Sequence, residues 1–425
     1  MSDPEADVTV SRCPVSGIAG NFDPFGAEYQ TDPPGMLRAA RHHQPVFYSE
    51  DLDYWVVTRY RDIKATFRDS SRFSASIALD PITPLRQPVV ELLRSYRFAP
   101  GPVLTNEDDP VHRARRKALA EPLLSRSVAK LENRIRALVS DYLDDIVPRG
   151  AADLVDDLLW DVPAIVGLLV VGVPDEDIDR ARNYSIKLGM FTWGRPTLEH
   201  QLEIADQVGQ WWTLAGELVE RLKRTGGTGW VPHAIDVQRT RPELVTDNHL
   251  QNMLMSGLVA AHETTTNAAG NALRYLLEHR EAWAELCGDS TLIPNAVEEC
   301  LRFSSSVQCW RRRALVDVPV GGTVIPAGGK VLLMIGSGNH DDDVFPQPDT
   351  LDIRRANATE HLAFGAGNHV CMGAPLARLE LRIILEELTR RLPGMRLVPG
   401  QNYDYRRNAS FHGPQHLLVE WDTPS

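Results

Sequence analysis

Apolar residues recur at helical spacing through the central part of the chain. From Val111 to about Leu286 the pattern is mainly helical, and residues 128–146 and 201–223 both place apolar side chains at i, i+3 and i+4. The longest predicted helix runs from Asp247 to Glu278, with Thr246 as its N-cap. At 1.5 Å per residue this helix would be roughly 48 Å long, which is enough to cross a whole domain.

Shorter runs predict a small amount of β-structure on either side of this helical region. Residues 45–58 contain two β-rich runs around Ser-Glu-Asp and predict a hairpin. Further strands are predicted at 312–320, 322–326 and 330–335, and an irregular stretch follows from there to Glu360. A last helix is predicted from Cys371 to Leu392, followed by a last strand at 417–421. We therefore predict one mainly α domain with a small β region over residues 22–425, preceded by a loose N-terminal arm over residues 1–21.

Composition and charge exclude several classes of protein. The formal net charge of −12 disfavours nucleic acid as a partner, because phosphate contacts are made by surplus Lys and Arg. The apolar run 162–173 is shorter than the roughly 20 residues that span a membrane, so it predicts a buried helix. The first twenty residues are acidic and polar and do not resemble a secretion signal, which predicts a cytoplasmic protein. The five cysteines form no C-x-x-C pair, so a disulfide framework or structural zinc site is not expected.

The strongest chemical motif is the ten-residue loop FGAGNHVCMG at 364–373. Cys371 stands directly before the last predicted helix, where free backbone N–H groups and the helix dipole lower the pKa of a thiol. Gly365 and Gly367 allow a tight turn, and Gly373 leaves room for a flat macrocycle. A thiolate on haem iron donates electron density that favours O–O cleavage. A buried structural cysteine is the alternative, and a lone cysteine would favour it.

The complete loop resembles the haem-binding signature of the cytochrome P450 superfamily, F-G-x-G-x-H-x-C-x-G, at every specified position. The resemblance implies haem b as cofactor, Cys371 as the axial iron ligand, and the mainly α cytochrome P450 fold. It places Phe364, Gly365, His369 and Gly373 at the haem. It covers the chain from about Phe22 to the C-terminus, and within the superfamily it is similar to a bacterial group whose haem domain is often fused to a reductase.

The middle of the long helix resembles the oxygen-activation stretch of the same family. Ala260-Ala261-His262-Glu263-Thr264-Thr265 matches A-G-x-[DE]-T-T, with Ala261 where Gly is usual. Positions 260, 263, 264 and 267 share one helix face, so small Ala260 and Ala261 would let that face approach a porphyrin. Glu263 and Thr264 are the predicted catalytic pair, because an acid and a hydroxyl relay protons to activated oxygen. An ordinary buried helix is the alternative for this segment alone.

Further matches are expected to hold the haem and the core behind it. His112 and Arg116 match an H-x-x-x-R motif, and with Arg312 and His369 they supply cations and donors for the propionates. Glu299 and Arg302 match the family's structural E-x-x-R pair. The family often adds a third basic residue from the irregular stretch downstream, but Thr350, Leu351 and His340 stand where that stretch is usually more basic or aromatic, so the sequence does not name it.

These resemblances imply a monooxygenase that inserts one oxygen atom from O₂ into a small aromatic or heteroatom-bearing substrate by hydroxylation, dealkylation or sulfoxidation. A peroxygenase that uses H₂O₂ and a non-enzymatic haem-thiolate binding or sensing protein are the alternatives. Substrate walls are predicted in variable segments, namely 77–82, Met190, Phe191, Val259, 307–309, Ser410 and Phe411.

No cysteine follows Cys371, so a fused ferredoxin with clustered cysteines is not expected within this chain. The electrons are therefore expected from a ferredoxin with its reductase, or from a flavin reductase, unless the chain is a fragment of a fused enzyme. Arg113, Arg115 and Lys117 are predicted to form a basic docking patch near the thiolate side of the haem. A solvated helix face is the alternative for these three residues.

Overall fold

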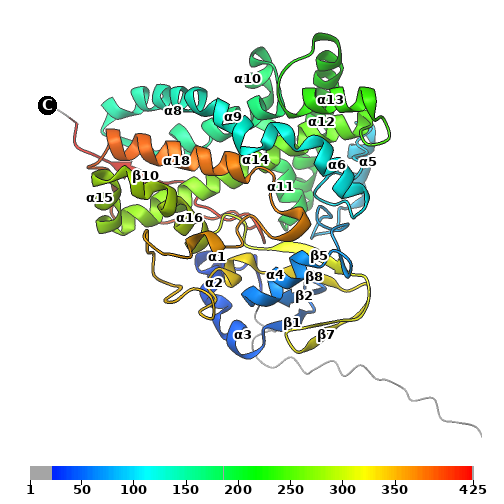
Figure 1. The fold of residues 1–425 in the computed structure, drawn as a ribbon, viewed down its shortest axis with the longest axis horizontal. Helices are drawn as coiled ribbons and strands as arrows, with labels where there is room; N and C mark the ends of the chain where they lie inside the picture. The colour runs from blue at the N-terminus through cyan, green and yellow to red at the C-terminus, as the bar shows by residue number, and fades with distance from the viewer. Residues whose placement is uncertain (1–21, 185, 424–425) are drawn as a thin grey trace, which may run out of the picture.

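The computed structural model describes residues 22–184 and 186–423, so the predicted arm over residues 1–21 lies outside the described residues. The fold is mainly α with a small β region, as the sequence predicts. Figure 1 shows the long helices stacked in one part of the molecule and the main sheet, with the first short helices, in the other.

The helices confirm the long central pattern. In chain order they are α1 (Ala27–Thr31), α2 (Pro33–Met36), α3 (Arg38–His43), α4 (Tyr60–Arg68), α5 (Gln87–Ser95), α6 (Val111–Leu119), α7 (Ser125–Val128), α8 (Glu132–Ile146), α9 (Asp161–Val171), α10 (Ile178–Ala181), α11 (Ile186–Trp193), α12 (Leu198–Thr225), α13 (Trp230–Thr240), α14 (Asp247–Glu278), α15 (Arg280–Gly288), α16 (Ile293–Phe303), α17 (Ile335–Gly338) and α18 (Ala374–Arg391). The apolar run at 162–173 is the buried helix α9, as predicted.

The strands form three small sheets. They are β1 (Val46–Ser49), β2 (Tyr54–Val57), β3 (Phe73–Ser74), β4 (Ala151–Asp153), β5 (Trp310–Ala314), β6 (Val318–Val320), β7 (Thr323–Ile325), β8 (Lys330–Leu333), β9 (Arg396–Leu397) and β10 (Leu418–Glu420). The largest sheet has the order β1-β2-β8-β5-β3, and the others are β4-β10-β9 and β6-β7. The predicted hairpin is confirmed as the antiparallel pair β1 and β2.

The predicted strand 312–320 is wrong as a single element. It is divided between β5 and β6, because the chain bends at Leu315 and Val316. Leu315 and Val316 are 50% and 47% exposed in the turn between the two strands. Their apolar character therefore imitates a strand that the tertiary structure does not form.

Helix α14 runs through the whole core and positions the candidate site. Thr246 caps it by accepting a hydrogen bond from the N–H of His249, as predicted. Its first half, from Leu250 to Leu258, packs in one apolar cluster with α12 and α13. Its second half, from Ala268 to Leu277, packs in another with α8, α9, α16 and α18. Residues 260–267 lie between the two clusters, where part of the helix surface stays accessible.

Candidate functional site: a cysteine loop facing the central helix

The loop that carries Cys371 is held in a tight conformation by glycine and backbone hydrogen bonds. Gly365 and Gly367 adopt φ of 69° and 73°, which side chains rarely allow. A Cβ on Gly367 would also lie 2.5 Å from the carbonyl oxygen of Phe67 on α4, so this position has no room for one. The N–H of Cys371 donates to the carbonyl of Phe364 at 2.9 Å. The loop is therefore fixed before any ligand binds.

The last helix begins later than predicted, and this changes how it meets Cys371. Helix α18 starts at Ala374, since Pro375 has no N–H to give and fits the first turn, so Cys371 lies three residues before it. Cys371 is exposed in the loop, yet desolvation around its sulfur raises the pKa of the thiol above its usual value, although N–H groups of Gly373 and Ala374 and the charge of Arg116 act to lower it. The sequence predicted that N–H groups at the helix start lower this pKa. The N–H groups of Gly373 and Ala374 do act in that direction, but the net shift is upwards, so the predicted net shift is wrong. A coordinated metal ion deprotonates a thiol outright, so a thiolate at Cys371 depends on the metal.

The accessible stripe in the middle of α14 is formed by Ala260, Ala261 and Thr264. Ala260 is exposed and the other two are half-buried, in a helix that is otherwise largely covered. The Thr264 hydroxyl donates to the carbonyl of Ala260 at 2.6 Å. A Cβ on Gly373 would meet only the Cys371 sulfur, at 3.7 Å. Both the helix and the cysteine loop therefore present small residues where a flat ring would lie.

Glu263 is adjacent to Thr264 in sequence but has different surroundings. Its side chain is 3% exposed and one carboxylate oxygen lies 3.6 Å from Nη1 of Arg406. Burial raises its pKa to about 7, and Arg406 opposes the shift. It lines a cavity together with Thr266 and Asn267, whereas Thr264 does not. The sequence predicted that Glu263 and Thr264 share one helix face. The structure instead places them on different sides of α14.

The four predicted propionate-binding residues gather beside the cysteine loop. The rings of His112 and His369 stack with centroids 3.8 Å apart, and Arg116 donates to the carbonyl of Val370 at 2.5 Å. Burial lowers the pKa of Arg312 to about 10. Burial, together with the charges of Arg312, His112 and Arg116, lowers the pKa of His369 to about 3. The charges of Arg116 and Arg312 therefore destabilise the charged forms of both histidines, and an anionic ligand would relieve this repulsion.

Both ring nitrogens of His112 are buried without a hydrogen bond among the described residues, and Nδ1 lies 3.5 Å from the carboxylate of Asp109. Nε2, on the other side of the ring, makes no hydrogen bond within residues 22–184 and 186–423. A buried polar atom of this kind normally has a hydrogen-bond partner. An anionic group at this point would accept a hydrogen bond from it, and the nearby Arg312 would supply the charge. The residues present therefore fit the two carboxylates of a haem.

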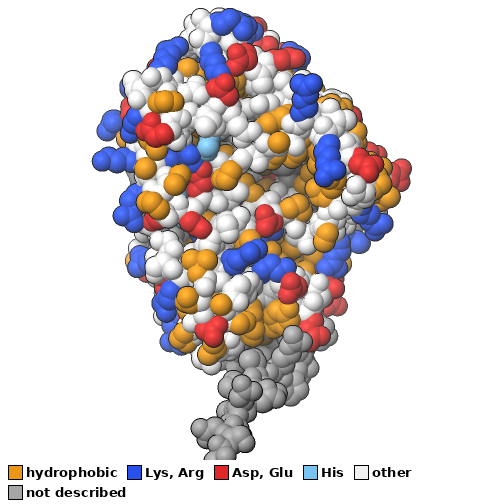
Figure 2. Space-filling view, turned by 90° about the vertical axis from the view of Figure 1, so that its right-hand side faces the viewer, with side chains coloured by type: hydrophobic (Ala, Val, Ile, Leu, Met, Phe, Trp, Pro, Cys, Tyr) orange, Lys and Arg blue, Asp and Glu red, His pale blue; other side chains and the backbone are white. Residues whose placement is uncertain are grey.

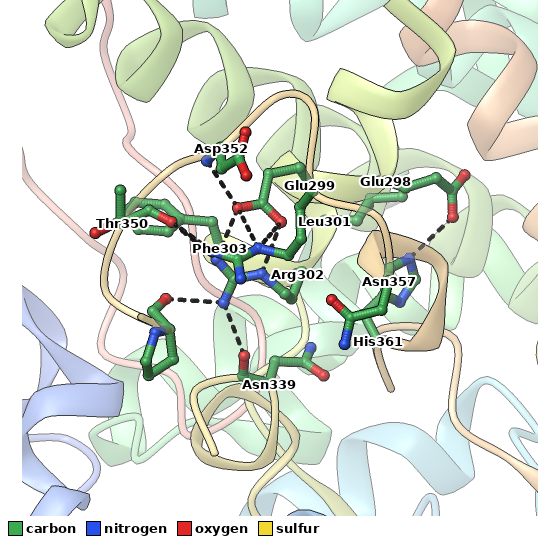
Figure 3. Close-up of polar contacts among 12 residues, drawn as sticks. Glu298, Glu299, Leu301, Arg302, Phe303, Asn339, Thr350, Asp352, Asn357 and His361 are labelled. Carbon is green, nitrogen blue, oxygen red and sulfur yellow. Dashed lines mark hydrogen bonds and ion pairs between the residues drawn. The ribbon is translucent and has the colours of Figure 1, made fainter. Parts of the chain in front are cut away.

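The Glu299–Arg302 pair is a fully buried ion pair on α16, as expected from the E-x-x-R spacing (Figure 3). Arg302 donates to the two carboxylate oxygens of Glu299 at 2.7 and 2.8 Å and to the carbonyl of Asn339 at 2.9 Å. The third basic residue, which the sequence did not name, is Arg355, whose Nε lies 3.0 and 3.1 Å from the same carboxylate. No spacing rule links Arg355 to α16.

Other predicted residues have structural partners of their own. The guanidinium of Arg378 on α18 lies 4.6 Å from the centre of the Phe364 ring and pairs with Glu298 at 2.6 Å. Nε2 of His340 donates to the carbonyl of Phe303 at 2.8 Å, and its Nδ1 lies 2.9 Å from a carboxylate oxygen of Asp349. These contacts place Phe364 against α18 and tie the irregular stretch to α16.

The structure brings most of the predicted substrate walls together. The N–H of Ile82 donates to the carbonyl of Thr192, Val307 is bridged to Phe411, and the Cys309 thiol donates to the carbonyl of Ala409. Ile77, Cys309 and Phe411 share an apolar cluster with Trp193, against which Ile82 and Val307 pack. Phe191, with Met190 packed against it, belongs to a different cluster, around α12. Val259 is 8% exposed on α14.

The predicted docking patch is smaller than the sequence suggested. Arg115 is buried, where it pairs with Glu107 and donates to the carbonyl of Leu244, so it does not belong to a surface patch. Arg113 and Lys117 are exposed on α6, and Arg113 pairs with Asp109 at 2.9 Å. Figure 2 shows the side of the molecule where α6 lies, and there basic and acidic side chains are interspersed.

Comparisons with known proteins identify the family and the fold. The family model for cytochrome P450 matches residues 233–392. The chain is 35% identical to the nocardicin C N-oxygenase of Nocardia uniformis subsp. tsuyamanensis, over 94% of this chain and 98% of that protein. It superposes on an intact type IV self-sufficient cytochrome P450 monooxygenase with a TM-score of 0.95 and 51% identity, over 97% of this chain but only 54% of that one. It superposes on cytochrome P450 CREJ in complex with (4-ethylphenyl) dihydrogen phosphate with a TM-score of 0.90 and 34% identity, over 95% of this chain and 100% of that one.

The fold and these similarities define a cytochrome P450 monooxygenase. The chain belongs to the cytochrome P450 family, and its cofactor is haem b. Members of this family in general use O₂, an organic substrate and a redox partner. The chain spans about half the length of the intact self-sufficient monooxygenase that it matches. Within the described residues no helix is long and apolar enough to cross a membrane.

Proposed function

We propose that this monooxygenase acts on small aromatic or heteroatom-bearing molecules, by hydroxylation, O- or N-dealkylation, or sulfoxidation. The observation that supports this is the set of wall segments tied together around Trp193. Ile77, Val307 and Phe411 supply apolar and aromatic side chains there, which suit a compact substrate better than a long polar one. The complex of the similar CREJ protein with an ethylphenyl phosphate is consistent with an aromatic group in such a pocket.

The proposed roles of the site residues follow from their positions. Cys371 would bind the iron, and Ala260, Ala261, Gly365 and Gly373 would leave room for the ring. His112, Arg116, Arg312 and His369 would hold the propionates. Once bound, haem with a thiolate ligand supplies the activation of O₂. The Thr264 hydroxyl would donate a proton on the accessible side of α14. Glu263 would supply protons from the buried side of the same helix.

A spectral screen coupled to turnover tests the substrate class. The haem protein is titrated with small aromatic ethers, thioethers and phenols, and the shift of the haem absorbance on binding is recorded. Binders are then incubated with a reductase and NADPH, and oxygenated product is counted per NADPH oxidised. Aromatic binders with coupled product formation support the proposal. Coupled turnover of long aliphatic compounds alone contradicts the substrate class. Product that forms with H₂O₂ but never with NADPH contradicts the O₂-dependent route.

We further propose that the electrons come from a separate ferredoxin or flavin reductase that docks near Arg113 and Lys117. Both are exposed on α6, the helix that also carries His112 and Arg116 of the propionate cluster. Opposite charges across an interface mainly raise the association rate and are screened by salt. Reduction by an acidic ferredoxin should therefore slow as ionic strength rises, and slow further in an Arg113→Glu, Lys117→Glu variant. Arg126→Glu, a reversal of a 71% exposed arginine beyond α6, is the matched control. Equal rates in all three proteins at low salt would place the docking site elsewhere.

A further inference from the structure

Arg311 on β5 is a fully buried cation, with 0% of its surface exposed. Its guanidinium lies 3.7 Å from the centre of the Trp193 ring. Its Nη2 donates to the carbonyl of Thr192 at 2.8 Å, and its Nη1 donates to the carbonyl of Asp80. Nε is buried and makes no hydrogen bond within residues 22–184 and 186–423. A guanidinium has five N–H donors, so these two carbonyls leave much of its capacity to donate unused.

The charge of Arg311 has no counter-ion among the described residues. The buried Arg302 and Arg355 share the carboxylate of Glu299, whereas the acceptors of Arg311 are two neutral carbonyls. The nearby Cys309 thiol is also neutral, because burial raises its pKa to about 12 although the charge of Arg311 acts to lower it. A buried charge without an ionic partner is costly. The carbonyls and the indole face offset part of this cost, and an oxyanion would supply the missing charge.

Arg311 faces the proposed substrate walls. Successive side chains of a strand point to opposite faces of the sheet. Arg311 is in register with Leu332, which belongs to the apolar cluster around Trp193. Arg312 is in register with Val331, which belongs to a different cluster. The two adjacent arginines are therefore divided between the faces of β5, with Arg312 in the propionate cluster and Arg311 among the walls.

Arg311 also lies close to the surface of the molecule. Asp80, whose carbonyl accepts from Arg311, is exposed in the irregular segment 75–86 between β3 and α5. Ile82 of the same segment is half-buried and packs against the cluster of the substrate walls. The guanidinium is therefore placed beneath one surface segment, at the boundary between the substrate walls and solvent.

We propose that Arg311 binds an oxyanion carried by the aromatic substrate, a carboxylate or a phosphate, so that the enzyme selects small aromatic acids over their neutral analogues. This rests on the proposed function and deepens it by naming the substrate class. The unused N–H groups of Arg311 would donate to the oxyanion, while the carbonyls of Asp80 and Thr192 hold the guanidinium against Trp193. Arginine suits this role because its planar fork of donors matches the oxygens of a carboxylate or phosphate.

The test compares ligands that differ in charge and little else. The ferric haem protein is titrated near neutral pH with para-propylbenzoate and para-propylbenzamide, and the shift of the haem absorbance gives each affinity. A second arm compares para-propylphenyl phosphate with its dimethyl ester, which distinguishes a phosphate from a carboxylate as the preferred group. In at least one arm the acid should bind about tenfold more tightly or better, since a charge-assisted hydrogen bond contributes that much. Equal affinities of acid and neutral analogue in both arms would overturn the proposal.

Substitutions assign the preference to Arg311. Arg311→Met should bring the ratio of the two affinities close to one, and Arg311→Lys should keep part of it, because the charge remains but the fork is lost. The ratio is taken within each variant, so a general loss of affinity cancels. Arg313→Met is the matched control, because Arg313 is on the same strand and is exposed. It should keep the wild-type ratio, and equal ratios in Arg311→Met and Arg313→Met would contradict the role of Arg311.

A crystal structure of the wild-type haem protein with the preferred acid keeps the proposal testable if Arg311→Met does not fold. The oxyanion should lie within hydrogen-bond distance of Nε of Arg311, and an oxyanion bound elsewhere would refute the proposal.

The proposal and the proposed function can fail separately. Coupled turnover of neutral aromatic ligands without any preference for their acids would leave the proposed function standing and remove the role of Arg311. A preference for aliphatic acids that is lost in Arg311→Met, without turnover of aromatic ligands, would keep the oxyanion site and remove the aromatic substrate class.

Discussion

Replacement of Arg355 by Met tests whether the buried network behind the haem depends on a residue that the sequence did not identify. Arg355 is 7% exposed. Its Nε donates to both oxygens of Glu299, and its other nitrogens donate to the carbonyls of Pro346 at 2.7 Å and Thr350 at 3.0 Å. Met keeps a long apolar stem but removes the charge and all of these donors.

The magnitude follows from what remains after the substitution. Arg302 still pairs with Glu299, and the N–H of Asp352 still donates to it at 3.0 Å, so the carboxylate keeps a cation and a donor. The loss is one charge-assisted hydrogen bond, worth about 1.5–3 kcal/mol, and a carbonyl at Pro346 that loses its Arg355 donor, at about 1–3 kcal/mol. The sum of about 2.5–6 kcal/mol brackets the usual cost of breaking a buried pair, about 3–5 kcal/mol. It is a large fraction of a typical unfolding free energy of about 5–15 kcal/mol.

Arg354→Met is the control for this prediction. Arg354 pairs with Glu285 at 2.9 Å, but the two side chains are 59% and 48% exposed. An exposed pair of this kind contributes about 0–1 kcal/mol. Urea unfolding of the haem protein, followed by haem absorbance and by circular dichroism, should give a clearly lower midpoint for Arg355→Met and a nearly unchanged one for Arg354→Met. Equal midpoints for the two variants would refute the reasoning.

Three further substitutions test the site. Cys371→His should abolish oxygenation and the far-red Soret band of the reduced, CO-bound protein, and persistence of that band would show that Cys371 is not the ligand. Thr264→Ala should leave substrate binding nearly intact but raise the peroxide released per NADPH oxidised several-fold; unchanged coupling would leave Thr264 a packing residue. Burial acts to raise the pKa of Glu298, but hydrogen bonds from Arg378 and His361 outweigh it and lower the pKa to about 2. The stability that this shift contributes is therefore present above the unfolded pKa and is lost as pH falls towards 2. Glu298→Gln should flatten the loss of unfolding free energy between about pH 5 and pH 2, and an acid limb as steep as the wild type would contradict this assignment.

Elements with strong local signals were predicted well from the sequence. Helix α14 was predicted with its bounds and its cap, because a threonine cap precedes a long helical pattern. The cysteine loop was found because its glycines, histidine and cysteine occur within ten residues. The strand boundaries after Arg302 were less accurate, since Leu315 and Val316 are apolar and nevertheless exposed.

Residues that act across long sequence separations could not be predicted in this way. Arg355 lies 56 positions from Glu299, in an irregular stretch where the adjacent Arg354 has the same chemistry and points to solvent. Arg406 and Arg407 are likewise identical neighbours, and only Arg406 reaches Glu263. Which of two adjacent arginines is turned inwards is set by the packing of the whole chain. Spacing along the sequence does not contain that information.

The different surroundings of Glu263 and Thr264 explain why an acid and a hydroxyl are both useful in the middle of α14. Adjacent residues on a helix point about 100° apart, so one helix can present them to separate compartments. Thr264 lies on the accessible stripe with Ala260, where haem and substrate are expected. Glu263 lies on the buried side, beside the polar cavity and Arg406. Its pKa of about 7 lets it gain and lose a proton near neutral pH, as a proton-transfer group must. In the proposed function, the carboxyl and the hydroxyl would therefore act from different sides of one helix.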